Sequence, residues 1–75
     1  MGVNMASHMP MKYEEKALLS RADIANRLRQ LADQVARGNV AYGDVQTTMP
    51  EQAAYEFEVD IHGRTKEISI EIEWR

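Results

Sequence analysis

Residues 56–75 alternate between apolar and polar side chains with a period of two. Such alternation is typical of β-strands that bury one face and leave the other in water. Gly63-Arg64 interrupts the pattern, and glycine at the first central position suits a type II′ hairpin turn. That turn pairs Val59 with Ile68, and this register places two apolar rows on one face. A register longer by one residue in each strand would keep the same faces. The rows are Tyr55, Phe57, Val59 and Ile61, and then Ile68, Ile70, Ile72 and Trp74.

Further upstream the period of the apolar residues changes to that of a helix. Ser20 is a favourable N-cap, and Asp23 stands three residues later, where an acid suits the positive end of a helix. Gly38 is placed to end the helix in the left-handed conformation. We therefore predict a helix over residues 21–37, with one apolar face. That face is made of Ile24, Ala25, Leu28, Leu31, Ala32 and Val35.

Residues 39–49 alternate again and contain the turn sequence Gly43-Asp44. A two-residue turn there pairs Tyr42 with Val45, and Pro50 ends the second strand because proline cannot donate a ladder hydrogen bond. The sequence therefore predicts a second, shorter hairpin. Residues 12–17 admit two interpretations, a short extra edge strand or an irregular lead-in to the helix.

These elements predict the α+β class. We expect one amphipathic helix packed on a four-stranded antiparallel sheet made of two hairpins, with the extra N-terminal edge strand as an option. The 75 residues suffice for one small domain, and we place it at residues 9–75. Residues 1–8 are predicted to be a disordered remnant of expression cloning.

The formal net charge is −3, and the acidic excess lies in residues 51–75. The polar face of the C-terminal hairpin carries a row of carboxylates. It is a docking surface for a basic partner, a weak cation site, or a solvated face that protects the strands. Trp74 follows the parity of the apolar row, so it is either a core residue or an exposed anchor. These residues form the candidate interaction surface: Glu56, Glu58, Asp60, Glu71, Glu73 and Trp74, with Glu67 in the same row.

The helix also carries four arginines that are candidates for phosphate contacts. They are Arg21, Arg27, Arg29 and Arg37. Acidic residues are interspersed with them, and a net acidic chain is a poor nucleic-acid binder because affinity comes mostly from neutralising phosphates. Nucleic acid is therefore the disfavoured partner.

The sequence contains no motif from which a reaction can be argued. His62 flanks a predicted turn, and no nucleophile, base and orienting residue form a recognisable set around it. The chain has no cysteine, no phosphate-binding loop and no metal-ligand spacing. We therefore expect no enzyme, no catalytic residues, no metal and no cofactor.

The helix segment "LSRADIANRLRQLADQVARG" and the ending "EISIEIEW" together resemble the amphi-Trp domain, a small bacterial and archaeal domain. The resemblance covers about residues 12–74. It implies the helix-and-hairpin fold described above and brings no activity with it. The matching residues are Ser20, Arg21, Ala25, Leu28, Arg29, Leu31, Ala32, Asp33, Glu71, Glu73 and Trp74.

We therefore expect a small non-catalytic module for protein interaction or self-association, with weak nucleic-acid binding through the helix arginines as the alternative. The partner is an unknown protein or a second copy, and an apolar patch around Trp74 and Tyr55 or a free sheet edge is the expected contact. The sequence has no apolar run of 18 residues, so we expect no membrane-spanning helix. A cytoplasmic location is the default expectation.

Overall fold

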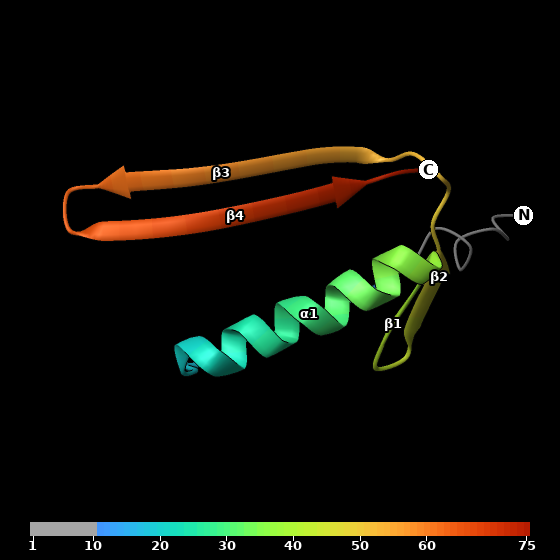
Figure 1. The fold of residues 1–75 in the computed structure, drawn as a ribbon, viewed down its shortest axis with the longest axis horizontal. Coiled ribbons are helices and arrows are strands. Elements are labelled where there is room, and N and C mark those ends of the chain that lie inside the picture. Colours follow the sequence, from blue (N-terminus) through green and yellow to red (C-terminus); the bar gives the residue numbers. More distant parts are fainter. Residues whose placement is uncertain (1–10) are drawn as a thin grey trace, which may run out of the picture.

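The computed structural model describes residues 11–75 and has one helix followed by two hairpins (Figure 1). The predicted remnant at residues 1–8 lies outside the described residues. The elements are α1 (Arg21–Arg37), β1 (Asn39–Tyr42), β2 (Val45–Thr48), β3 (Ala54–His62) and β4 (Thr65–Glu73). The α+β class predicted from the sequence is confirmed.

The helix begins and ends where its capping residues predict. The side chain of Ser20 accepts a hydrogen bond of 3.0 Å from the backbone N–H of Asp23. Gly38 adopts the left-handed conformation with φ of 74°, and its N–H returns to the carbonyls of Gln34 and Val35. Both ends of the helix thus have partners for backbone groups that the helix itself leaves unpaired.

Both hairpins have the predicted register. β1 pairs with β2 so that Tyr42 lies opposite Val45, and β3 pairs with β4 so that Val59 lies opposite Ile68. Gly63 has a φ of 55°, and no residue other than glycine has a positive φ among the described residues. This is the backbone that a type II′ turn requires.

The two hairpins form two separate two-stranded sheets, where the sequence predicted one four-stranded sheet. β2 and β3 are not hydrogen-bonded neighbours, because residues 49–53 lie between them in irregular conformation and Pro50 offers no N–H. The β1–β2 hairpin is instead tied to the C-terminal end of α1. Met49 donates to the carbonyl of Gly38 (2.9 Å), and Ala41 donates to Oε1 of Gln34 (2.7 Å).

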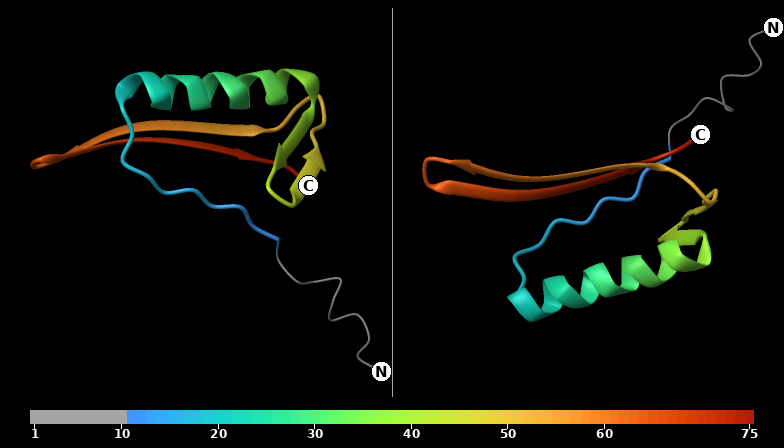
Figure 2. Two further views of the ribbon diagram at one scale, coloured as in Figure 1. Left: turned by 90° about the horizontal axis from the view of Figure 1, so that it is seen from below. Right: turned by 45° about the horizontal axis from the view of Figure 1, so that its top comes forward.

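The extra edge strand near residues 12–17 is not confirmed, because residues 11–20 have no regular secondary structure. This segment runs back from α1 toward the β1–β2 hairpin (Figure 2). Two side-chain contacts hold it there. The ring of Tyr13 stacks on Tyr42 with centroids 5.4 Å apart, and Glu15 forms an ion pair with Arg27.

The structure contains no closed core within the described residues, because none of their apolar side chains is buried. α1 runs alongside the β3–β4 hairpin (Figure 1), but none of its Cα atoms lies within 8 Å of a Cα atom of β3 or β4. Apolar side chains from the helix and both hairpins gather at one end only. They line a pocket of about 240 Å³ and are Leu31, Val35, Val40, Met49, Ile70, Ile72 and Trp74.

Replacing Gly38 by alanine should destabilise the fold through the backbone of the helix end. An added Cβ would meet only the carbonyl oxygen of Met49 at an ordinary 3.5 Å, so the left-handed φ is the source of the cost. We expect Gly38→Ala to lower the free energy of unfolding by about 1 kcal/mol, measured by urea unfolding at a fixed protein concentration. Gly38→Asn is the control and should lose less, since asparagine tolerates this conformation; equal losses would contradict the explanation.

Candidate functional site

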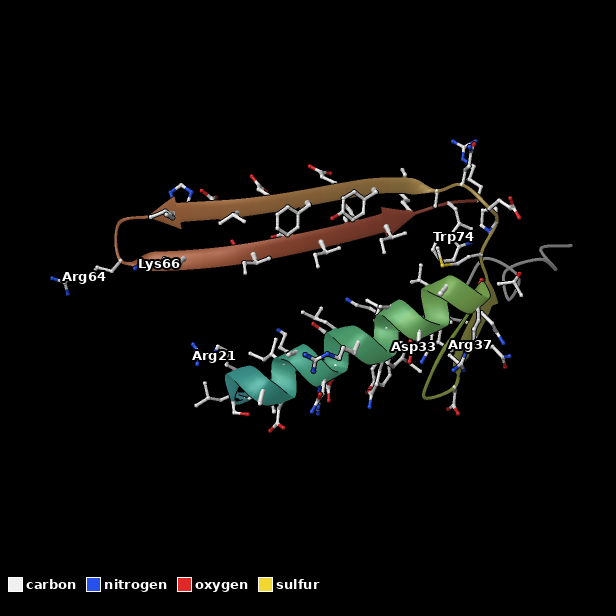
Figure 3. All side chains as sticks on the ribbon, in the orientation of Figure 1. Arg21, Asp33, Arg37, Arg64, Lys66 and Trp74 are labelled. Atoms are coloured by element: carbon white, nitrogen blue, oxygen red, sulfur yellow. The ribbon has the colours of Figure 1, made fainter. Side chains whose placement is uncertain are left out.

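The acidic row lies on one face of the β3–β4 hairpin, as the alternation requires. Glu56 pairs with Glu71 and Asp60 pairs with Glu67 across the strands. Like charges directly opposite each other destabilise a strand pair slightly. Several oxygen-tipped side chains project from the hairpin on the side away from α1 (Figure 3). The structure therefore brings the predicted carboxylates together, with Glu58 and Glu73 in the same row.

The acidic row does not form a cation site in the described residues. Carboxylates on a flat sheet diverge, whereas Ca²⁺ needs six or more oxygen ligands that converge. Among residues 11–75, no three acidic or histidine side chains are arranged to hold a metal. At the end of the row, Nε2 of His62 lies 3.0 Å from Oδ2 of Asp60 at an exposed position.

Trp74 lies at the junction of the helix and the two hairpins (Figure 3). It follows β4, is half-buried, and donates a hydrogen bond of 3.1 Å from Nε1 to the carbonyl of Thr48 at the end of β2. Its ring lines the apolar pocket with Leu31 and Val35 of α1. Trp74 thus joins the two hairpins by a hydrogen bond and contributes to the apolar cluster beside the helix.

Within residues 11–75, most of the exposed large apolar side chains lie on the other face of the same hairpin, which we call the apolar face. Sequence reasoning placed these side chains against the helix, but only the end near Trp74 reaches it. The exposed fractions are Tyr55 68%, Phe57 52%, Val59 60%, Ile61 68%, Ile68 69% and Ile70 44%. A signal was present in the sequence: two apolar rows on a hairpin are more than one short helix can cover.

The four helix arginines do not converge on one surface. At about 100° per residue their side chains leave the helix in four directions about 80° apart. Arg21 and Arg37 lie at opposite ends of α1 (Figure 3), about 24 Å apart along its axis. Arg29 donates to Oδ1 of Asn26 (2.9 Å). Phosphates of one nucleic acid backbone would not meet all four side chains together.

Arg27 is already engaged by a carboxylate. It donates from Nε to Oε1 of Glu15 (3.1 Å) and from Nη2 to Oε2 (3.0 Å). Such two-pronged pairs have a geometry that favours both charged forms. Hydrogen bonding to Arg27 lowers the pKa of Glu15, and the same bond raises the pKa of Arg27. The pair borders an open groove of about 520 Å³ between the lead-in and α1, with Tyr13, Leu28 and Tyr42 among its lining residues.

The elements define a small α+β domain of one capped helix and two antiparallel hairpins, with an acidic and an apolar face on the longer hairpin. A family model for the Amphi-Trp domain matches residues 5–75, and the chain belongs to that family. Comparisons with curated proteins and with solved structures return no match. Of the helices in the described residues, none is long and apolar enough to cross a membrane.

Substituting Trp74 by phenylalanine should weaken the junction between the hairpins. Phenylalanine keeps most of the ring contacts but cannot donate to the carbonyl of Thr48, and we expect a loss of about 1 kcal/mol in the free energy of unfolding. Urea unfolding followed by circular dichroism measures the change. Thr48→Val is the control, since the acceptor belongs to the backbone and survives that substitution. A Trp74→Phe variant as stable as the parent would show that the bond contributes nothing.

The Glu15–Arg27 pair should make part of the stability depend on pH. Because the pKa of Glu15 is lower in the folded chain, its contribution is present above the ordinary glutamate pKa and is lost as pH falls through the lowered value. In an NMR titration we expect Glu15 to titrate below an ordinary exposed glutamate, and Arg27→Gln to return it to the ordinary range. Added salt should weaken this difference, since the pair is exposed. An unchanged titration in Arg27→Gln would exclude the pair as the cause.

Proposed function

We propose that this protein is a small non-catalytic interaction module that binds protein through the apolar face of the β3–β4 hairpin. The observation that carries the proposal is the exposure of that face, from 44% at Ile70 to 69% at Ile68. Contiguous apolar surface that remains in water typically marks an interaction site. The binding would rest on burial alone and requires no reacting group.

Burial of this face would supply substantial free energy. Fully burying a valine, isoleucine or phenylalanine side chain is worth about 1.5–3 kcal/mol. Six such large side chains at roughly half exposure therefore represent several kcal/mol, before the entropy lost on association is subtracted. The apolar face is thus a stronger source of affinity than the acidic row, whose exposed charges gain little from pairing in water.

The acidic row has a different role in this proposal. Six carboxylates hydrate the opposite face and direct any partner to the apolar side. A cytoplasmic setting for this interaction is part of the proposal, and the absence of cysteine from the sequence is compatible with it. Weak nucleic-acid binding has less support, because Arg27 is held by Glu15 and the other arginines point apart.

Two neighbouring substitutions on β3 test the proposal. Val59 lies on the apolar face and Glu58 on the acidic face, so Val59→Lys and Glu58→Lys introduce the same charge on opposite sides. With each variant as bait for affinity capture and mass spectrometry, we expect Val59→Lys to lose the captured protein, own chain or other, by about tenfold or more. Glu58→Lys should retain it. Loss with Glu58→Lys alone would assign binding to the acidic row, and no loss with either would refute both surfaces.

A further inference from the structure

The uncovered part of the apolar face belongs mainly to β3. The cluster beside α1 takes Ile70, Ile72 and Trp74 from the β4 side of the hairpin and no residue from β3. The β3 row is exposed along its whole length, from Tyr55 at 68% to Ile61 at 68%. The helix thus leans toward β4, and no helix or strand within residues 11–75 covers the β3 row.

The surface area of the chain is large enough for a further contact of ordinary size. The chain exposes 7311 Å², whereas a compact protein of 8.6 kDa exposes about 4,700 Å². The first ten residues can contribute about 1,600 Å² of this total at most. Residues 11–75 therefore expose at least about 5,700 Å², whereas a compact chain of 65 residues exposes about 4,200 Å². The excess is larger than the roughly 800 Å² per partner that a stable interface buries.

We infer that a second copy of this chain covers the face, with the apolar rows of two β3–β4 hairpins packed against each other about a two-fold axis. This inference rests on the proposed function and names the partner. A two-fold contact brings one patch onto itself, so the patch must be self-complementary. The β3 row meets this condition because its four side chains are apolar. The acidic face does not, since six carboxylates would oppose six carboxylates.

The marginal stability of the single chain favours a copy of itself over a different protein. An isolated two-stranded hairpin is at best marginally stable in water, and small domains without disulfides or metals commonly gain stability by association. Copies of one chain are synthesised together, so each copy has a possible partner at its own concentration. Folding and pairing would then be one equilibrium, as in obligate homodimers.

Packing face to face fits the side chains better than joining two strand edges. In an extended sheet the side chains stand perpendicular to the plane, so joining β3 edge to β3 edge would leave the apolar rows in water. It would also bring Glu58 opposite Asp60 of the second copy or opposite its own equivalent, which is unfavourable. Two faces about 10 Å apart instead bury Phe57 and Val59 and leave both acidic rows on the outside.

Lys66 is the one charged side chain within the two apolar rows, and its place agrees with this arrangement. It pairs with Ile61 beside the hairpin turn, at the end of the face (Figure 3). A long lysine side chain at such a rim covers apolar surface with its methylene groups while its ammonium group stays in water. The face can therefore be buried without burying a charge.

A scan of single cysteines on β3 tests the inference, and the natural lack of cysteine makes each variant unambiguous. Purified variants with cysteine at 57, 59 or 61 report the apolar face, and those with cysteine at 56, 58 or 60 report the acidic face. With a bismaleimide cross-linker whose reach is about 10 Å, the spacing of two facing sheets, we expect linked dimers at one or more odd positions and at no even position, because only the odd side chains face the second copy. Cross-links at both odd and even positions would indicate that two strand edges pair, and would overturn face-to-face packing.

Sedimentation of the purified parent chain over a concentration series completes the test. We expect a dimer that Val59→Lys weakens by about tenfold or more and Glu58→Lys leaves intact. A parent chain that stays monomeric at high concentration and forms no cross-link overturns the second copy as partner. If Val59→Lys still reduces affinity capture in that case, the proposed function stands without this inference. If Val59→Lys does not reduce capture, the proposed function itself fails.

Discussion

The contact on which the arrangement depends is the cluster around Trp74. Its indole donates to the carbonyl of Thr48, and its ring shares a pocket with Leu31 and Val35 of α1. The longer hairpin, the shorter hairpin and the helix meet at this place. Because the cluster lies at one end of β4, it fixes that end of the hairpin and leaves the nine-residue strands to extend past the helix. The open apolar face is the consequence of this one-ended attachment.

A small chain with these elements has few other ways to arrange them. One helix of 17 residues presents a single apolar stripe, and the stripe must serve both hairpins. Its C-terminal half packs near β1, where Gln34 also reaches the backbone of Ala41. Its N-terminal half leaves Ile24 and Leu28 nearly half exposed. The shortage of covering surface therefore follows from the small number of elements, and the proposed association would compensate for it.

The local features of the fold could be predicted from the sequence because local interactions set them. Ser20 and Gly38 define the helix ends through backbone hydrogen bonds within a few residues, and Gly63 defines the register of β3 and β4 through its turn. The separation of the two sheets could not be predicted in this way. Whether β2 and β3 pair depends on the path of residues 49–53, and alternation in the flanking strands is the same in either case.

The candidate site also has features that the sequence predicted and features that it did not. The acidic row followed directly from the period of two, so Glu56, Glu58 and Asp60 lie on one face as expected. The exposure of the apolar row was not predicted, since a period identifies which side chains share a face but not what covers that face; only the number of elements signalled it. The ion pair between Glu15 and Arg27 also escaped prediction, because it joins a helix to a segment without periodic structure.

The two faces of the hairpin together limit how chains can assemble. A long exposed strand edge normally invites further strands and open-ended growth. Here each added strand would align carboxylate rows such as Glu56, Glu58 and Asp60 with those of its neighbour, and each such pair is repulsive. The apolar face carries no comparable barrier, and in the proposed dimer it would be fully occupied once two copies meet on it. The same alternation that makes the hairpin amphipathic thus favours a closed pair over a filament.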